Sequence, residues 1–357
     1  MNTRVNRNKN NTDKITKVRK VLLVLLPVVL VVIAIAGFKA YGVKQNLDTT
    51  YSDGQAVKSR DSKSVLSNKK PISVLLLGTD TGDMKRSYKG RTDSIMIATV
   101  NPKTQKTDLI SLPRDSMISV VGYENEFPQK LNAAYSFGDS GTTINTIQKW
   151  LNVPIDFYAT VNMGGIEKLV DDLGGVDVVS PLTFDYEGVS FKEGEKQHLN
   201  GFQALKFSRM RYDDPQGDYG RQARQRLVIE AMINKIKDNP ASVNSALVND
   251  ISKNLKTNVR TNSIPGLAKD YIGAAKNISS NHLEGESKMY NGVSYEFVTQ
   301  DKKQNITNLI RSDLGLPAEK TGALYGGDVL NSAQDQNVVD ATEGTSTDAT
   351  GSEVAQQ

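Results

Sequence analysis

Residues 72–80 read ISVLLLGTD, a continuous apolar run that ends in a short polar loop sequence. Such a run, bounded by turn residues, predicts a strand that is buried on both faces and a loop at its carboxyl end. Two further runs, SIMIATV at 94–100 and TDLISL at 107–112, predict neighbouring strands. Three buried strands in close succession place the centre of the fold in a sheet.

Helical patterns alternate with strand patterns in the chain that follows. This alternation predicts one layered α/β domain with a central mixed sheet flanked by helices. After residue 239 we expect a helical remainder that runs to about residue 319. The expected strands are 157–161 and 176–179, and the expected helices are 145–151, 164–173, 200–207 and 220–238.

The amino-terminal region predicts a membrane anchor. Residues 21–38 read VLLVLLPVVLVVIAIAGF without a charge, which is long enough to cross a hydrocarbon core. Seven Lys or Arg residues and one Asp precede this run, which predicts a cytoplasmic amino terminus. A cleaved signal peptide is the alternative, and either segment exports the rest of the chain.

The chain therefore divides into five expected segments. A single domain is expected because no linker interrupts its strand and helix patterns. The last segment has six acidic residues after position 320 and no basic one, which is typical of disorder. The segments are a cytoplasmic basic tail (1–20), a transmembrane anchor (21–43), a stalk (44–70), an extracellular catalytic domain (71–319) and a disordered acidic tail (320–357).

Composition limits the available chemistry. The 357 residues include no Cys, which excludes disulfides, thiolate zinc sites and a Cys nucleophile. They include only two His. Chemistry must then use carboxylates, guanidinium or ammonium groups, hydroxyls or a hard cation. The formal charge of +4 combines a basic start with an acidic end, so it does not indicate nucleic-acid binding.

The stretch 208–226, SRMRYDDPQGDYGRQARQR, is unusual because all five of its basic residues are Arg. Arg binds phosphate oxygens in pairs, whereas Lys acts as a point charge, so the stretch indicates oriented oxyanion binding. An ordinary solvated helix face with ion pairs to nearby Asp residues is the alternative. The five are Arg209, Arg211, Arg221, Arg224 and Arg226.

Helical spacing refines this hypothesis. Arg221 and Gln225 are four residues apart and share one face near a helix amino terminus, where phosphates bind favourably. Val228 and Met232 follow on that face. A polar head above an apolar stripe suits an amphiphile with a phosphate head and a hydrocarbon tail, while packing in the core is the alternative.

Two carboxylates and one guanidinium lie where the predicted strands begin or end. Asp80 follows the first strand, Asp93 precedes the second, and Arg114 follows the third. Loops at one edge of an α/β sheet commonly build its ligand site. Two carboxylates there could hold Mg²⁺, whose other ligands are phosphate oxygens and water. Either Asp alone could instead be a turn or cap residue.

Together these motifs resemble those of the LytR-CpsA-Psr family. The resemblance covers residues 71–235, and seven short motifs in the same order make it specific. They are LLLGTD (75–80), GRTDSIM (90–96), SLPRDS (111–116), KLNAAYSFG (130–138), DLGGVDV (172–178), HLNGFQALKFSRMR (198–211) and GDYGRQARQ (217–225).

The resemblance implies a type II membrane protein of a Gram-positive bacterium with its catalytic domain outside the cell. It implies a Mg²⁺-dependent phosphotransferase that moves an anionic glycopolymer, teichoic acid or capsular polysaccharide, from undecaprenyl pyrophosphate to peptidoglycan. The long helix and the sheet would enclose the lipid. No nucleic-acid partner is implied.

The resemblance also assigns roles to residues of this chain. Asp80 and Asp93 would hold the metal, and Asp93 is also a candidate general base. Ile118 stands where some family members have a second Arg after the Pro-Arg-Asp motif, a departure from the family pattern that affects the expectation for one pyrophosphate contact but not for the reaction. The pyrophosphate would be bound by Arg91, Arg114, Arg209, Arg211 and Arg221, with Asp218 and Gln225 orienting these arginines.

Two other functions fit the same residues. A non-catalytic protein that binds a lipid-linked pyrophosphate would need the arginines but not both Asp80 and Asp93. A membrane-bound attenuator or regulator of cell-envelope processes would need a cytoplasmic reader of nucleic acid. Only the first 20 residues are expected in the cytoplasm, which is too few for a folded module of that kind.

Overall fold

The computed structural model describes residues 51–79, 90–239, 254–271, 273–274, 277–322 and 338–340. The predicted cytoplasmic tail and anchor, and most of the predicted acidic tail, lie outside these residues. Within the described part of the chain, no helix has both the length and the apolar character needed to cross a membrane.

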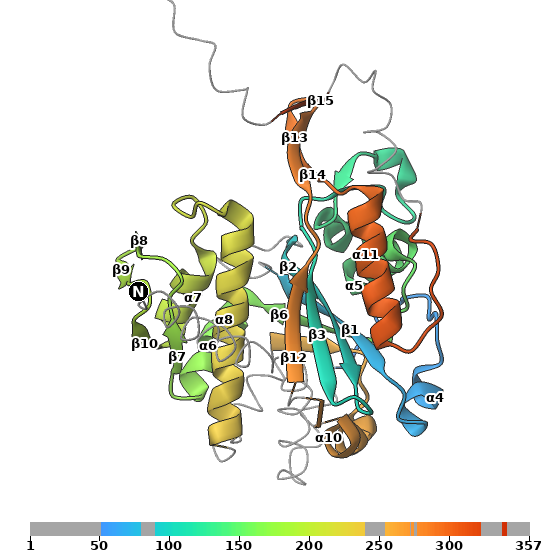
Figure 1. Cartoon of the computed structure of the whole chain (residues 1–357), viewed down its shortest axis with the longest axis horizontal. Helices are drawn as coiled ribbons and strands as arrows, with labels where there is room; N and C mark the ends of the chain where they lie inside the picture. Colours follow the sequence, from blue (N-terminus) through green and yellow to red (C-terminus); the bar gives the residue numbers. More distant parts are fainter. Residues whose placement is uncertain are drawn as a thin grey trace, which may run out of the picture.

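The centre of the fold is a six-stranded mixed sheet in the order β11-β6-β1-β2-β3-β12 (Figure 1). β1 runs antiparallel to β2 and parallel to β6, and β12 runs parallel to β3. The sheet confirms the three strands expected from the apolar runs. Its strands are β1 Ile72–Thr79, β2 Thr92–Asn101, β3 Lys106–Ser111, β6 Phe157–Asn162, β11 Leu255–Thr257 and β12 Asn277–His282.

One face of the sheet is covered by α5 (Ala133–Leu151) and α11 (Gln300–Asp313). Apolar side chains that point to this face from β1, β2 and β3 meet those of the two helices in the main core. Successive side chains of a strand point to opposite faces of the sheet, so alternate residues of each strand enter this core. The core includes Leu75, Leu77, Ile95, Ile97, Ile110, Ile144, Ile147, Trp150, Ile306 and Ile310.

The opposite side of the sheet faces α8, with α6 and α7 beyond it (Figure 1). These helices and the short strands β7 to β10 share a second apolar core. A capping box begins α7, because Asn200 and Gln203 each bond the other's main-chain N–H. The elements are α6 Met163–Asp172, β7 Val176–Val179, β8 Phe184–Tyr186, β9 Val189–Phe191, β10 Lys196–Leu199, α7 Gly201–Arg209 and α8 Gly217–Asp238.

Two expectations about chain organisation were wrong. The remainder after residue 239 is not all helical, because it supplies two strands of the main sheet and a projecting hairpin. The expected stalk is folded from residue 51 onward, since Arg60 forms an ion pair with buried Asp156 and Tyr51 bridges Thr257. The additional elements are α4 Ser62–Ser67, β4 Met117–Ile118, β5 Gln129–Lys130, α10 Ile264–Tyr271, β13 Glu286–Tyr290, β14 Val293–Phe297 and β15 Val338–Asp340, which pairs with β13.

Candidate functional site

A cavity of about 610 Å³ lies where the sheet, α5, β14 and the loop after α7 meet. Four of its lining side chains are cationic and two are carboxylates, so the cavity favours an anion. The predicted residues Arg91, Asp93, Arg114 and Arg211 all line it. The full lining is Gly90, Arg91, Asp93, Arg114, Asp115, Lys130, Asn132, Ser136, Arg211 and Ser294.

Arg114 is surrounded by three carboxylates. It forms an ion pair with Asp93, and its Nη2 lies 3.3 Å from Oδ1 of Asp218. Its Nε lies 3.5 Å from Oδ2 of Asp115. Burial opposes the charge on Arg114, but the carboxylates of Asp218, Asp115 and Asp93 outweigh burial and raise its pKa. The guanidinium is therefore held charged and fixed in orientation.

Asp218 in the first turn of α8 joins the predicted arginines to one another. Its Oδ1 accepts hydrogen bonds from Arg221 Nη2 at 2.7 Å and Nε at 3.0 Å, and its Oδ2 accepts one from Gln222 at 2.9 Å. Burial tends to raise the pKa of Asp218, but Arg221 and Arg114 hold it below its ordinary value. The structure thus places Asp218 between Arg114 and Arg221, two of the arginines that it was expected to orient.

Arg221 lies beneath the cavity rather than in its lining. It is buried, and burial lowers the pKa of its guanidinium despite the nearby Asp218. Its Nη2 also donates to the main-chain oxygen of Asp93 at 3.0 Å. Arg209, the last residue of α7, is half-buried and outside the cavity lining. Gln225 is buried, and neither of its amide atoms has a hydrogen-bond partner among the described residues.

Arg224 has a structural role that the sequence did not distinguish. It is fully buried, donates to the main-chain oxygens of Phe207 and Met210, and forms an ion pair with Asp214. These contacts fix the turn between α7 and α8, from which Arg211 reaches the cavity. Arg224 therefore fixes the turn that carries Arg211, so these two arginines of the stretch have different roles.

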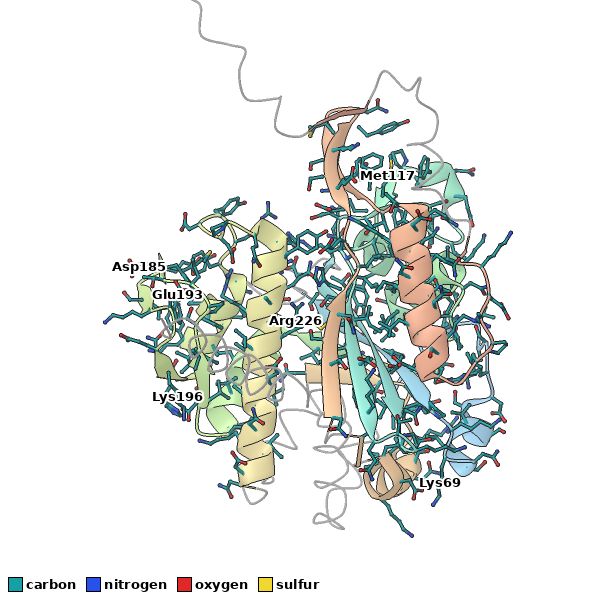
Figure 2. All side chains as sticks on the ribbon, in the orientation of Figure 1. Lys69, Met117, Asp185, Glu193, Lys196 and Arg226 are labelled. Atoms are coloured by element: carbon teal, nitrogen blue, oxygen red, sulfur yellow. The ribbon has the colours of Figure 1, made fainter. Side chains whose placement is uncertain are left out.

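The apolar stripe on α8 packs in the second core. Val228 is buried there and Met232 packs against it, so both side chains face α6, α7 and β7. The structure thus gives them the core-packing role, the alternative to lining a lipid pocket. The side of α8 that faces the sheet carries Arg226 (Figure 2), whose Nη1 donates to Ser111 Oγ at 2.9 Å. Glu230, one helical turn further on, is also buried.

Six residues of the lining were not predicted as site residues, and one of them is Gly90 in the motif GRTDSIM. Lys130, Asn132 and Ser136 belong to the motif KLNAAYSFG, and Asp115 belongs to SLPRDS. These motifs were noticed, but nothing in the sequence placed their side chains beside the arginines. Ser294 comes from β14, a strand that was not expected at all.

The predicted Mg²⁺ site fits the described residues in part. Asp93 brings a carboxylate to a cavity suited to phosphate, and Mg²⁺ commonly takes only one or two protein carboxylates. Asp80, the second expected ligand, lies outside the described residues. Among the residues described, no three His, Asp or Glu side chains gather in a metal-binding group. Ile118 is completely buried in the main core, where a second Arg would be out of place.

Comparison with known proteins identifies the family. The sequence profile of the LytR_cpsA_psr family matches residues 36–312. The polyisoprenyl-teichoic acid--peptidoglycan teichoic acid transferase TagU of Enterococcus faecalis is 40% identical over 280 residues, which cover 78% of this chain and 91% of that protein.

Solved structures are also similar to this chain. Protein gbs0355 from Streptococcus agalactiae matches with a TM-score of 0.68 and 33% identity, covering 78% of this chain and all of that one. TagT bound to LIIa-WTA matches with a TM-score of 0.58 and 27% identity, covering 73% of this chain and 96% of that one.

The chain belongs to the LytR_cpsA_psr family, as its motifs predicted. Within this family it is a transferase, like the Enterococcus faecalis relative with which it shares most of its length.

Proposed function

We propose that this protein is a Mg²⁺-dependent phosphotransferase that moves an anionic glycopolymer from undecaprenyl pyrophosphate to peptidoglycan. The glycopolymer is a teichoic acid or a capsular polysaccharide. The observation that carries the proposal is the position of Arg114, which lies in a cationic cavity with Arg91 and Arg211 and is fixed by three carboxylates. The teichoic acid transfer performed by the TagU relative supports it.

The chain's own residues suit such a transfer. A pyrophosphate carries several negative charges, and transfer develops further charge on its bridging and equatorial oxygens. Arg91, Arg114 and Arg211 would bind these oxygens, and Arg114 would do so without reorganisation because its carboxylate partners already hold it. Asp218 and Arg221 support Arg114 from below.

Asp93, with Asp80, would hold the Mg²⁺ ion, which when bound neutralises phosphate charge and makes the phosphorus more open to attack. We propose that the cationic segment 1–20 lies in the cytoplasm and that 21–43 anchors the chain in the membrane. The catalytic domain then lies on the outer surface of a Gram-positive cell. Its site would there meet the lipid-linked donor and the wall together.

The test uses the full chain in detergent micelles. It is incubated with a disaccharide linked to a polyprenyl pyrophosphate, with peptidoglycan fragments and with Mg²⁺. Recovery of a phosphodiester between the disaccharide and peptidoglycan is the expected result. Tight donor binding without any product would establish the non-catalytic binding protein instead, and free sugar phosphate alone would establish a hydrolase.

A further inference from the structure

A second group of polar side chains lines the cavity beside the arginines, and one of its members, Asp115, also contacts Arg114. We call Asp115, Lys130, Asn132 and Ser136 the polar wall. They come from the loop after β3, from β5 and from the start of α5. Figure 1 shows α5 on the opposite side of the molecule from α7, after which Arg211 follows. An anion bound by Arg91, Arg114 and Arg211 would therefore have the polar wall beside it.

Asp115 keeps hydrogen-bonding capacity that Asp218 has used. Its Oδ1 lies 3.1 Å from Lys130 Nζ, and Arg114 approaches Oδ2 only to 3.5 Å. Its main-chain oxygen accepts a bond from Glu296 at 2.9 Å, which fixes the residue. Asp218, by contrast, already accepts bonds on both oxygens. A carboxylate has about four acceptor positions, so Asp115 can still receive hydroxyl groups.

Asn132 carries an unsatisfied amide. Only 5% of the residue is exposed, and its Oδ1 is buried without a hydrogen-bond partner among the described residues. Its main-chain N–H donates to the main-chain oxygen of Arg114 at 2.9 Å, so the residue is anchored while its side-chain oxygen Oδ1 has no partner among the described residues. A buried amide without a partner costs stability unless a ligand satisfies it. Ser136 adds a hydroxyl that donates to Ala133 at 2.7 Å and keeps its acceptor positions.

We infer that the polar wall is the subsite for the acceptor, a sugar unit that presents a free hydroxyl and N-acetyl groups. Uncharged sugars are recognised by carboxylate, amide and hydroxyl groups that exchange hydrogen bonds with their hydroxyls, rather than by clusters of arginine. The inference rests on the proposed function, since it places the second substrate of that transfer. The first sugar of the donor carries hydroxyl groups of the same kind. The experiment therefore distinguishes a subsite for the acceptor from a subsite for the donor sugar.

The experiment compares two pairs of variants of the full chain in detergent. Asp115→Asn and Lys130→Met alter the polar wall. Glu286→Gln and Lys288→Met are matched controls, because their ion pair on β13 has an N–O distance of 3.4 Å and Lys288 has 24% of its side chain exposed, as Lys130 does. The readouts are the KM for peptidoglycan fragments, the Kd for farnesyl pyrophosphate and the KM for the lipid-linked disaccharide.

We expect each polar-wall variant to raise the acceptor KM by about tenfold or more, the usual effect of losing a hydrogen bond to a charged group. Asp115→Asn and Lys130→Met raise the Kd for farnesyl pyrophosphate and the KM for the donor by a smaller factor than the acceptor KM, because Asp115 helps to hold Arg114 and Lys130 is one of the cations that line the cavity. All values for the controls stay within about twofold of wild type. Asn132→Leu gives a second test that does not depend on charge. Its midpoint of urea unfolding is retained, because no protein partner is lost, while its acceptor KM rises.

Two results overturn the inference while the proposed function stands. In the first, wild type transfers and all three polar-wall variants keep the acceptor KM of wild type. In the second, the variants raise the donor KM instead, which assigns the polar wall to the donor's own sugar. A wild-type chain that binds farnesyl pyrophosphate but transfers nothing overturns the proposed function, and the inference with it.

Discussion

Arg221 Nη2 donates a hydrogen bond of 3.0 Å to the main-chain oxygen of Asp93. This bond joins the first turns of α8 to the beginning of β2, and so links the two parts of the molecule on either side of the cavity. The same guanidinium holds Asp218, which in turn contacts Arg114. Arg221 therefore determines the relative position of the arginines without itself lining the cavity.

Arg221→Lys should weaken donor binding although it keeps the charge. An ammonium group cannot reach Asp218 and the Asp93 oxygen together, because it lacks the planar fork of guanidinium. Losing charged hydrogen bonds of this kind lowers the free energy of unfolding by about 1–3 kcal/mol. We expect an increase of about tenfold or more in the Kd for farnesyl pyrophosphate, measured by calorimetry.

The matched control is Arg260→Lys. Arg260 is exposed and lies over the ring of Tyr51 at 4.9 Å, away from the cavity lining. The Arg260→Lys protein should bind farnesyl pyrophosphate with the same Kd as wild type. An Arg221→Lys protein that binds the donor as tightly as wild type would mean that α8 and β2 hold the cavity without this bond.

Asp93→Asn should abolish transfer and leave most of the fold intact. The amide cannot supply a full charge to Mg²⁺, and metal-dependent stabilisation of the transition state is worth several kcal/mol, so kcat should fall by about a hundredfold or more. Arg114 still has Asp218 and Asp115 as partners. Chelation of Mg²⁺ with EDTA should reduce wild-type transfer similarly and should have little further effect on the variant.

Asp185→Asn is the control for that change, since Asp185 is exposed on β8 in the second part of the molecule (Figure 2). If Asp93→Asn transferred glycopolymer at the wild-type rate and still needed Mg²⁺, the metal would have to be held by other residues.

The sequence predicted the sheet's central strands because each carries an apolar run, and it missed the edge strands because they do not. β12 reads NISSNH and is a strand through its parallel pairing with β3. Tertiary pairing, rather than local propensity, decides such a segment. The hairpin β13–β14 did have a signal, since Asn291 and Gly292 form a turn with positive φ at both residues.

The sequence predicted that the arginines act as a group, but it did not predict which of them line the cavity and which hold the fold. Spacing placed Arg221 near a helix start, and residue type suggested oxyanion binding, which the cationic cavity supports. That Arg224 points into the protein and Arg211 into the cavity depends on where the chain turns between α7 and α8. The apolar stripe at Val228 was ambiguous, because a helix packed on both sides has two buried faces.

Arg224→Met should destabilise the protein and weaken donor binding indirectly. Removing one partner of a buried ion pair leaves Asp214 unpaired, which typically costs about 3–5 kcal/mol. The oxygens of Phe207 and Met210 also lose their donor. We expect a clear fall in the urea midpoint together with a rise in the Kd for farnesyl pyrophosphate.

The double variant Arg224→Met with Asp214→Asn removes the unpaired charge and should recover part of the stability. Donor binding should stay weak in the double variant, because the turn before Arg211 is still not held. Full recovery of binding along with stability would show that Arg224 does not position Arg211.

Glu230 should make the folded protein less stable as pH rises. Burial raises the pKa of its carboxyl to about 8, against a small opposing effect of Arg226, whereas an unfolded Glu titrates near about 4.3. Between these values the folded chain holds a proton that the unfolded chain has released. Unfolding therefore becomes easier across that window, with a contribution of up to about 1.4 kcal/mol per pH unit.

Glu230→Gln removes this titration, since the amide resembles the protonated carboxyl. The free energy of unfolding, measured with urea at intervals from pH 5 to pH 8, should fall with pH in wild type and fall less in the variant. Glu193→Gln, a change on an exposed loop, should follow wild type (Figure 2). Parallel curves for Glu230→Gln and wild type would mean that Glu230 is ionised in the fold and that Arg226 stabilises its charge.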